Sequence, residues 1–482
     1  MFDLRPVGYV IGLLVAILGL TMLLPMFIDL IDGNGHWPVF LESAALTGLT
    51  GGLMALACAN AVGEGLSIRQ TFLVTTGVWL ALPVFGALPF VLGATDATLV
   101  DGFFEAMSGL TTTGSTVFSD LDTLPRGLLL WRGLLQWIGG IGIIVVAMVF
   151  LPELRVGGMQ IFRSEGFDTF GKILPRATEI ASRISVIYLA LTVACGLSYF
   201  AAGMSGFDAA VHAMTTIATG GFANYDLSFG AFGPGAQYVA VIFMVLAALP
   251  FVRYVQLVAG SPRALLADSQ VRGFVMILAT VWIVLTLWRV VEAGEVTERS
   301  LREALFSVTS ILTGTGYANA DYMLWGAFPV AAIFFLGLIG GCAGSTACSV
   351  KVFRYQLLVS SVLAQIRTIH SPHGVFAPRY EGRAVGEDVL NSVMSFFVLF
   401  IVSLGLLSIA LGMTGLDFIT SLSGAAAALA NIGPGLGDVI GPAGNFASLN
   451  DTAKWLLAGA MWLGRLELLA VYAILTLNFW RG

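Results

Sequence analysis

Four segments of this 482-residue sequence combine threonine, serine and glycine in a pattern suited to binding a dehydrated alkali cation. Each begins with a semi-polar stretch as long as a short helix and then reaches glycine. Glycine permits the backbone angles that turn successive carbonyl groups to one side. Several such loops around an axis form rings of carbonyl oxygens that can replace the water around a cation. The four segments are Val100–Thr116, Phe207–Asn224, Leu301–Asn319 and Leu416–Gly437.

Two internal comparisons indicate that these segments are true repeats. The sequence FANYD at Phe222–Asp226 parallels YANAD at Tyr317–Asp321. An acidic residue also stands thirteen positions before the key glycine in three copies, whereas the fourth copy has Thr420 there and is the divergent one. The three pairs are Asp101 with Gly114, Asp208 with Gly221, and Glu303 with Gly316.

A half-length helix before each glycine would aim its negative dipole end and its unpaired carbonyls at the centre of a membrane. The chain must then return in extended form, and irregular backbone at that depth is tolerated only where it is buried or lines a wet cavity. The alternative interpretation is that the glycines let neighbouring helices pack closely. Recurrence in four copies between long apolar segments favours pore loops.

The composition indicates that the elements around these segments lie in a membrane. Hydrophobic residues make up 57% of the chain and charged residues only 11%, whereas an ordinary soluble domain carries roughly 25% charged residues. The net charge of −6 gives no reason to expect nucleic-acid binding. No cluster of nucleophiles, bases or metal ligands stands in the apolar segments, so the sequence does not predict an enzyme.

Ten segments are apolar and long enough to cross a bilayer, which takes about 20 residues of helix. The predicted class is therefore an all-α polytopic membrane protein. The eighth segment is too long for one span and is interrupted at Gly340–Gly344. The segments lie near residues 7–30, 39–62, 70–93, 127–151, 179–203, 235–259, 272–294, 327–365, 387–413 and 453–478.

Alternating spans sort most basic residues to one side, which the positive-inside rule assigns to the cytoplasm together with both termini. The opposite side carries Asp96, Asp120, Asp122, Asp226, Asp321 and Asp438. The basic side carries Arg5, Arg69, Arg155, Arg163, Lys172, Arg176, Arg183, Arg253, Arg263, Arg272, Lys351, Arg354, Arg367, Arg379, Arg383 and Arg481.

The loop motifs as a set resemble those of the Trk/Ktr/HKT potassium-transporter superfamily, and most closely those of the bacterial TrkH-type subunit. The run GGCAGSTACSVK at residues 340–351 and Arg465 in the last span belong to the same resemblance, which covers essentially the whole chain. The loop motifs are Thr111–Thr116, Ala218–Phe222, Thr313–Tyr317 and Asn431–Gly435.

This resemblance implies a unit of outer helix, pore helix, filter loop and inner helix, repeated four times after two extra N-terminal helices. The implied units are residues 1–65 for the N-terminal pair and 66–155, 170–262, 268–368 and 384–482 for the pore repeats, the third with a broken inner helix. A homodimer in the bacterial inner membrane is also implied, with a cytosolic TrkA-like ring of nucleotide-binding subunits. Potassium is then the transported ion, and no organic cofactor is expected on this chain.

The resemblance also assigns the filter. Serine at the first filter glycine accompanies sodium transport in the family, so glycine at all four positions favours potassium. Gly220 and Gly221 compete for the second position, and Gly221 is preferred because Phe222–Asn224 then aligns with Tyr317–Asn319. The fourth loop, with Pro434, departs most from the others. The expected filter residues are Thr112, Thr113, Gly114, Thr219, Gly220, Gly221, Gly314, Thr315, Gly316, Asn431, Ile432 and Gly433.

A broken helix at membrane depth normally lines a cavity, so the interrupted eighth span is expected to cross the ion path as a gate; a packed glycine kink is the alternative. Arg465 stands near the middle of the last span, where a charge is expensive and faces a cavity or a partner. Glu467 lies on another helix face and is a poor local partner. A gating role is preferred to a structural ion pair with another helix, because a fixed positive charge in a cation pore raises a barrier that a moving loop could offset. Lys351 and Arg354 are interpreted as anchors of a helix end at the cytoplasmic interface. The expected gating residues are Gly340, Gly341, Gly344, Ser345, Thr346, Lys351 and Arg465.

Other functions remain open at this point. A secondary transporter of an organic solute would use broken helices, but usually in two inverted repeats rather than four loops of one topology. The alternative to potassium uptake is a pathway permeable to both sodium and potassium, or a secondary transporter coupled to a second ion.

Overall fold

The computed structural model describes residues 3–61, 66–150, 157–159, 161, 177–294 and 296–481, and it is built almost entirely of helices. Among these residues the only strands are the antiparallel pair β1 (Arg379–Tyr380) and β2 (Arg383–Ala384). The predicted all-helical membrane class is confirmed. Arg155, Arg163, Lys172 and Arg176, which were assigned to the cytoplasmic side, lie outside the described residues.

Seven helical spans in the described part of the chain are long and apolar enough to cross a membrane. The first combines α1 (Arg5–Thr21) and α2 (Leu23–Asp32), and the third combines α4 (Ile68–Gly86) and α5 (Leu88–Val91). The others are α3 (Trp37–Cys58), α7 (Arg126–Val145), α10 (Ala177–Ala201), α15 (Ser269–Ala293) and α19 (Glu387–Met413).

Two segments that were predicted as regular spans are sharply bent. Helices α12 (Pro234–Ala247) and α13 (Phe251–Val258) meet at 89°, and α22 (Asp451–Arg465) and α23 (Leu469–Leu475) meet at 112°. The first break contains Pro250, whose ring excludes a continuous helix. The prediction of unbroken helices over 235–259 and 453–478 is therefore wrong, because hydropathy measures apolar length and not helix direction.

The predicted interruption of the eighth span is present. Helix α17 (Ala327–Gly337) ends before the break, and helix resumes only with α18 (Val352–His370). We call residues 338–351 between them the inner loop. The first inner helix, α7, is unbroken but ends in a π-helical turn at Val146–Phe150.

Four short helices precede the glycine loops: α6 (Leu99–Leu110), α11 (Gly206–Ile217), α16 (Glu298–Leu312) and α20 (Phe418–Ala430). A side chain at each N-cap accepts a backbone N–H of the first turn, which satisfies donors that the helix leaves free. Two of the predicted acids, Asp101 and Asp208, lie in these first turns, where the helix dipole favours negative charge. The N-caps are Thr98, Ser205, Thr297 and Asp417.

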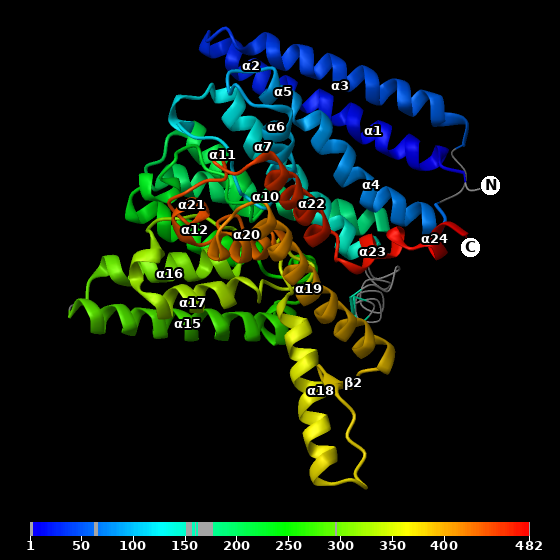
Figure 1. Cartoon of the computed structure of the whole chain (residues 1–482), viewed down its shortest axis with the longest axis vertical. Coiled ribbons are helices and arrows are strands. Elements are labelled where there is room, and N and C mark those ends of the chain that lie inside the picture. The colour runs from blue at the N-terminus through cyan, green and yellow to red at the C-terminus, as the bar shows by residue number, and fades with distance from the viewer. Residues whose placement is uncertain are drawn as a thin grey trace.

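The helices of the four predicted repeats close into a ring. Each predicted inner helix packs against the predicted pore helix that follows, with α7 on α11, α12 on α16, α17 on α20, and α22 back on α6. Figure 1 shows α1 and α3 along one side of this body and α18 projecting from it. The remaining short elements are η1 (Ala59–Ala61), η2 (Leu121–Thr123), η4 (Ser228–Ala231), η5 (Tyr322–Trp325), α14 (Arg263–Ala267), α21 (Gly437–Ile440) and α24 (Leu477–Arg481).

Candidate functional site

The four glycine loops share one backbone pattern. In each loop the key glycine has a positive φ, and so does the residue two positions before it. Alternation of left-handed with ordinary residues lets neighbouring carbonyl groups point to the same side. Gly221, rather than Gly220, holds the angle that the other three loops have at this position. The pairs are Thr112 (52°) with Gly114 (85°), Thr219 (49°) with Gly221 (80°), Gly314 (74°) with Gly316 (79°), and Asn431 (51°) with Gly433 (97°).

Contacts between the loops form a closed ring. A Cβ atom on Gly114 would collide with the carbonyl oxygen of Gly220, and the same holds for Gly221 against Thr315 and for Gly316 against Ile432. A Cβ on Gly433 would lie 2.9 Å from the carbonyl oxygen of Thr113, which returns to the first loop. Each of these four ring glycines is therefore required by the backbone of the next repeat. Their contacts bring the sequence-predicted filter residues together.

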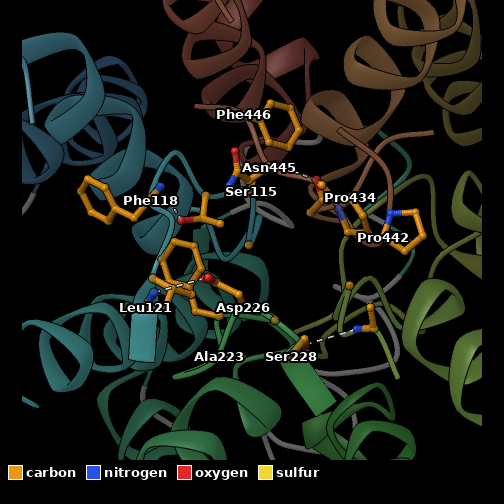
Figure 2. A pocket seen from close by; sticks show the side chains of 18 of the residues that line it. Ser115, Phe118, Leu121, Ala223, Asp226, Ser228, Pro434, Pro442, Asn445 and Phe446 are labelled. Carbon is orange, nitrogen blue, oxygen red and sulfur yellow. Dashed lines mark hydrogen bonds between the residues drawn. The ribbon is translucent and has the colours of Figure 1, made fainter. Parts of the chain in front are cut away.

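The four ring glycines line one cavity of about 240 Å³. Figure 2 shows this cavity with Ser115, Asp226 and Pro434 around it, and residues of all four predicted repeats line it. Asp226 accepts hydrogen bonds from the backbone N–H groups of Asp120 (2.9 Å) and Leu121 (3.2 Å), which joins the outer segments of the first two repeats. Polar groups from several repeats thus converge on the same side of the ring.

Side chains brace the divergent fourth loop against the first. The amide nitrogen of Asn431 donates to the hydroxyl of Thr113 at 2.8 Å and to the carbonyl of Met461 at 3.0 Å. The hydroxyl of Ser115 donates to the carbonyl of Gly433 at 2.7 Å. These bonds explain how a loop of different sequence occupies an equivalent place.

Sequence reasoning missed Gln136, which supports the second loop. Its side-chain amide donates to the carbonyl of Gly220 at 2.6 Å and accepts from the backbone N–H of Phe222 at 3.1 Å. A buried amide in the apolar segment 127–151 was the signal that could have found it, since buried polar groups need partners.

The inner loop binds the broken end of α12. Its residue Cys342 donates a backbone N–H to the carbonyl of Ala248 at 3.1 Å, and the hydroxyl of Thr346 donates to the carbonyl of Ala247 at 3.0 Å. In return, Phe251 donates its N–H to the carbonyl of Gly344 at 2.9 Å. Helix-end carbonyls that would otherwise lack partners are therefore satisfied by the inner loop.

The inner loop also reaches the ring and Arg465. The hydroxyl of Thr112 lies 3.9 Å from the sulfur of Cys348. Arg465 is 3% exposed, and its guanidinium donates to the sulfur of Cys348 and to the carbonyls of Thr346 (3.4 Å) and Gly139 (3.3 Å). Within the described chain no carboxylate forms an ion pair with it, and its Nε has no hydrogen-bond partner.

Lys351 and Arg354 do not anchor a helix end at the membrane interface, because their exposed fractions are only 6% and 0%. Lys351 Nζ lies 3.1 Å from Glu467 Oε1, and the guanidinium of Arg354 pairs with Glu467 Oε2. Arg354 also donates to the carbonyl of Gly157 at 2.9 Å. The earlier interpretation was wrong because Glu467, at the α22–α23 break, is distant in sequence but adjacent in space.

Comparisons with known proteins agree over the whole chain. A family model described as TrkH, cation transport protein, matches residues 36–477. The potassium uptake protein TrkI of Halomonas elongata is 42% identical, with 99% of this chain and 97% of that protein covered. TrkH of Escherichia coli K12 is 36% identical, with 99% of both chains covered. A crystal structure of the potassium transporter TrkH from Vibrio parahaemolyticus matches with a TM-score of 0.91 at 33% identity, covering 100% of both chains.

Proposed function

This chain belongs to the TrkH family of cation transport proteins, and we propose that it takes up potassium ions through the ring of four glycine loops. The observation that carries the proposal is the cyclic contact of each ring glycine with the carbonyl preceding the next ring glycine. Carbonyl oxygens held in such a ring can replace the hydration shell of an alkali cation. The proposed ligands are the carbonyls of Thr112, Thr113, Thr219, Gly220, Gly314, Thr315, Asn431 and Ile432.

Potassium is favoured over sodium by the absence of side chains on the ring glycines. A serine at Gly114 would place its Cβ against the carbonyl of Gly220, so the ring could not keep its present diameter. Relatives of this chain are named potassium uptake proteins. We therefore assign potassium as the transported ion.

The gate in this proposal is the inner loop together with Arg465. The loop lies between the ring and the broken end of α12, and the buried guanidinium holds its carbonyl at Thr346. A fixed positive charge beside a cation path raises a barrier to permeation. Movement of the inner loop and Arg465 together would lower that barrier.

We place the protein in the bacterial inner membrane as a homodimer with both termini in the cytoplasm. The two ends of the chain meet at the start of α4, which supports placing both termini on the same side of the membrane. Gln70 donates to the carbonyl of Asp3 at 2.9 Å, and the rings of Phe72 and Phe479 lie 6.0 Å apart. A cytosolic TrkA-like nucleotide-binding ring is the proposed regulator on that side.

Ion flux in proteoliposomes tests the function. The full chain should pass potassium and rubidium far faster than sodium, and Gly114→Ser should reduce this preference. Equal exclusion of all three ions by correctly folded protein, with and without the cytosolic partner, would refute the pore. If a proton or sodium gradient drives potassium against its own gradient, the transport is coupled and not passive.

A further inference from the structure

Glu105 and Arg132 form an ion pair that is almost completely removed from solvent. Glu105 lies on pore helix α6 and Arg132 on inner helix α7, and their exposed fractions are 0% and 2%. Arg132 Nε donates to Glu105 Oε1 at 2.8 Å. Arg132 also lines the cavity beside the ring glycines. A positive charge at this place needs a close countercharge if cations are to approach.

Both members of the pair bind the extended segments that leave the glycine loops, which we call the outer segments. Glu105 accepts hydrogen bonds from the hydroxyl of Thr116 at 2.9 Å and from the backbone N–H of Val117 at 3.0 Å. Arg132 donates to the carbonyl of Ala223 at 2.7 Å, and its guanidinium lies 4.2 Å from the ring centre of Phe222. One buried pair therefore connects the outer segment after the first glycine loop to the outer segment after the second.

The second repeat uses the corresponding helix position in a similar way. His212, like Glu105, stands nine residues before the ring glycine, and its Nε2 accepts the backbone N–H of Asn224 at 3.4 Å. Asn224 and Val117 each stand three residues after their ring glycines. The third and fourth repeats have Ser307 and Gly424 at the helix position, so among the four copies of this position the first alone carries an acidic residue.

Stability alone does not account for such a pair. Removing two charges from water is costly, and apolar residues of similar size often stabilise a protein as well or better. Apolar residues, however, could not accept the N–H of Val117 and donate to the carbonyl of Ala223. The charged pair is therefore explained by the hydrogen bonds that its two side chains form with the outer segments.

We propose that Glu105 and Arg132 are positioning residues for ion selectivity, which hold the first two loops at the separation that suits potassium. This inference rests on the proposed filter. When the pair is broken, the outer segments after Gly114 and Gly221 are free to shift, and the carbonyl ring adapts to smaller ions. Discrimination against sodium then decreases while cations still pass.

The test measures potassium and sodium flux in proteoliposomes for Glu105→Gln, Arg132→Gln and Arg132→Lys. The ratio of potassium to sodium flux should fall about tenfold in the two Gln variants, because the loops lose a fixed separation. Arg132→Lys should fall less, since one ammonium can reach Glu105 or Ala223 but does not span both as a guanidinium does. If Arg132→Gln fails to fold, Arg132→Lys and Glu105→Gln decide the result.

Arg289→Gln is the matched control. Arg289 pairs with Glu303 of α16 at 2.8 Å, donates to the carbonyl of Ser300 and lies 4.2 Å from the ring centre of Trp325, but none of these contacts reaches the three residues that follow Gly316. This variant should lower thermal stability without changing the flux ratio. An equal loss of selectivity in Arg289→Gln, or an unchanged ratio in folded Glu105→Gln and Arg132→Lys, would overturn the inference.

Gly114→Ser in the same assay separates the inference from the proposed function. If Gly114→Ser alters the flux ratio while the Glu105 and Arg132 variants do not, the positioning role fails and the filter stands. If Gly114→Ser also leaves the ratio unchanged, the filter itself is refuted.

Discussion

Thr112 and Thr219 adopt left-handed backbone angles although both side chains branch at Cβ. Such conformations cost of order 1–3 kcal/mol each and persist only where surrounding contacts determine them. Both residues stand two positions before a ring glycine, where the direction of the carbonyl groups matters most. Two of the proposed ion ligands therefore carry this local strain.

Gly221→Ala should reduce potassium flux by at least about tenfold, because the new Cβ needs a left-handed conformation and collides with the carbonyl of Thr315. Potassium uptake in proteoliposomes measures this effect. Gly233→Ala is the control, since Gly233 has ordinary backbone angles and open space around its Cβ position. Normal flux in Gly221→Ala would contradict the assigned role of this glycine.

Arg465→Ala should increase potassium flux by about tenfold, because a fixed positive charge and two bonds that hold the inner loop are removed. Flux measured without the cytosolic partner reports the change most directly. Arg126→Ala removes a partly exposed charge that pairs with Asp32, and it should leave flux unchanged. Unchanged or reduced flux in folded Arg465→Ala would count against the gate.

Three of the four inner helices are broken, and the breaks depend on one another. The inner loop of the third repeat satisfies the end of α12 in the second, while Glu467 at the α22–α23 break neutralises Lys351 at the end of the inner loop. Arg354 extends the same cluster to Gly157. The breaks therefore form one connected unit beneath the ring.

Glu467→Gln should destabilise the protein by roughly 3–5 kcal/mol, because it leaves two buried cations without a countercharge. Thermal unfolding in detergent or lipid measures the loss. Glu298→Gln removes an exposed carboxylate that pairs with Arg302 within one helix, and it should change the melting temperature little because Arg302 keeps a bond to Gln237. Similar melting temperatures for Glu467→Gln and the parent would contradict the buried cluster.

Sequence patterns could predict the helical class, the four loops and the interruption after α17, because these depend on local composition and on repeated spacing. They could not predict the bends after Ala247 and Arg465, since the hydropathy of an apolar segment is the same whether its helix is straight or bent. Gln136, Glu105 and Arg132 were missed for a related reason. Gln136 and Arg132 bind the second loop from the first repeat, and Glu105 meets Arg132 on a different helix, so only the folded ring brings these groups together.

At the scale of the whole molecule, the ring is built from unequal repeats. The first and third loops each place two threonine hydroxyls close together, 2.7 Å apart for Thr111 and Thr113 and 2.8 Å for Thr313 and Thr315. The second is held by Gln136, and the fourth by Asn431. A ring of equivalent carbonyls is thus maintained by four different sets of side chains.

Tags at the two termini should both be protected from a protease added outside intact cells and cleaved in inside-out vesicles, because both ends lie beside the start of α4. A tag inserted after Gly203, in an open turn before the second pore helix, should show the opposite behaviour. Cleavage of either terminal tag in intact cells would contradict the proposed orientation.

The bond from Asn431 to Thr113 joins residues 318 positions apart in the chain. The first and last repeats also meet through the bond from Ser115 to Gly433, the bond from the N–H of Phe446 to the carbonyl of Thr116, and the packing of α22 on α6. A nascent chain that has inserted three repeats therefore still lacks one wall of the ring. If the ring conducts as proposed, its path is complete only when the last repeat has been inserted, and an unfinished polypeptide would not dissipate the ion gradients of the cell that makes it.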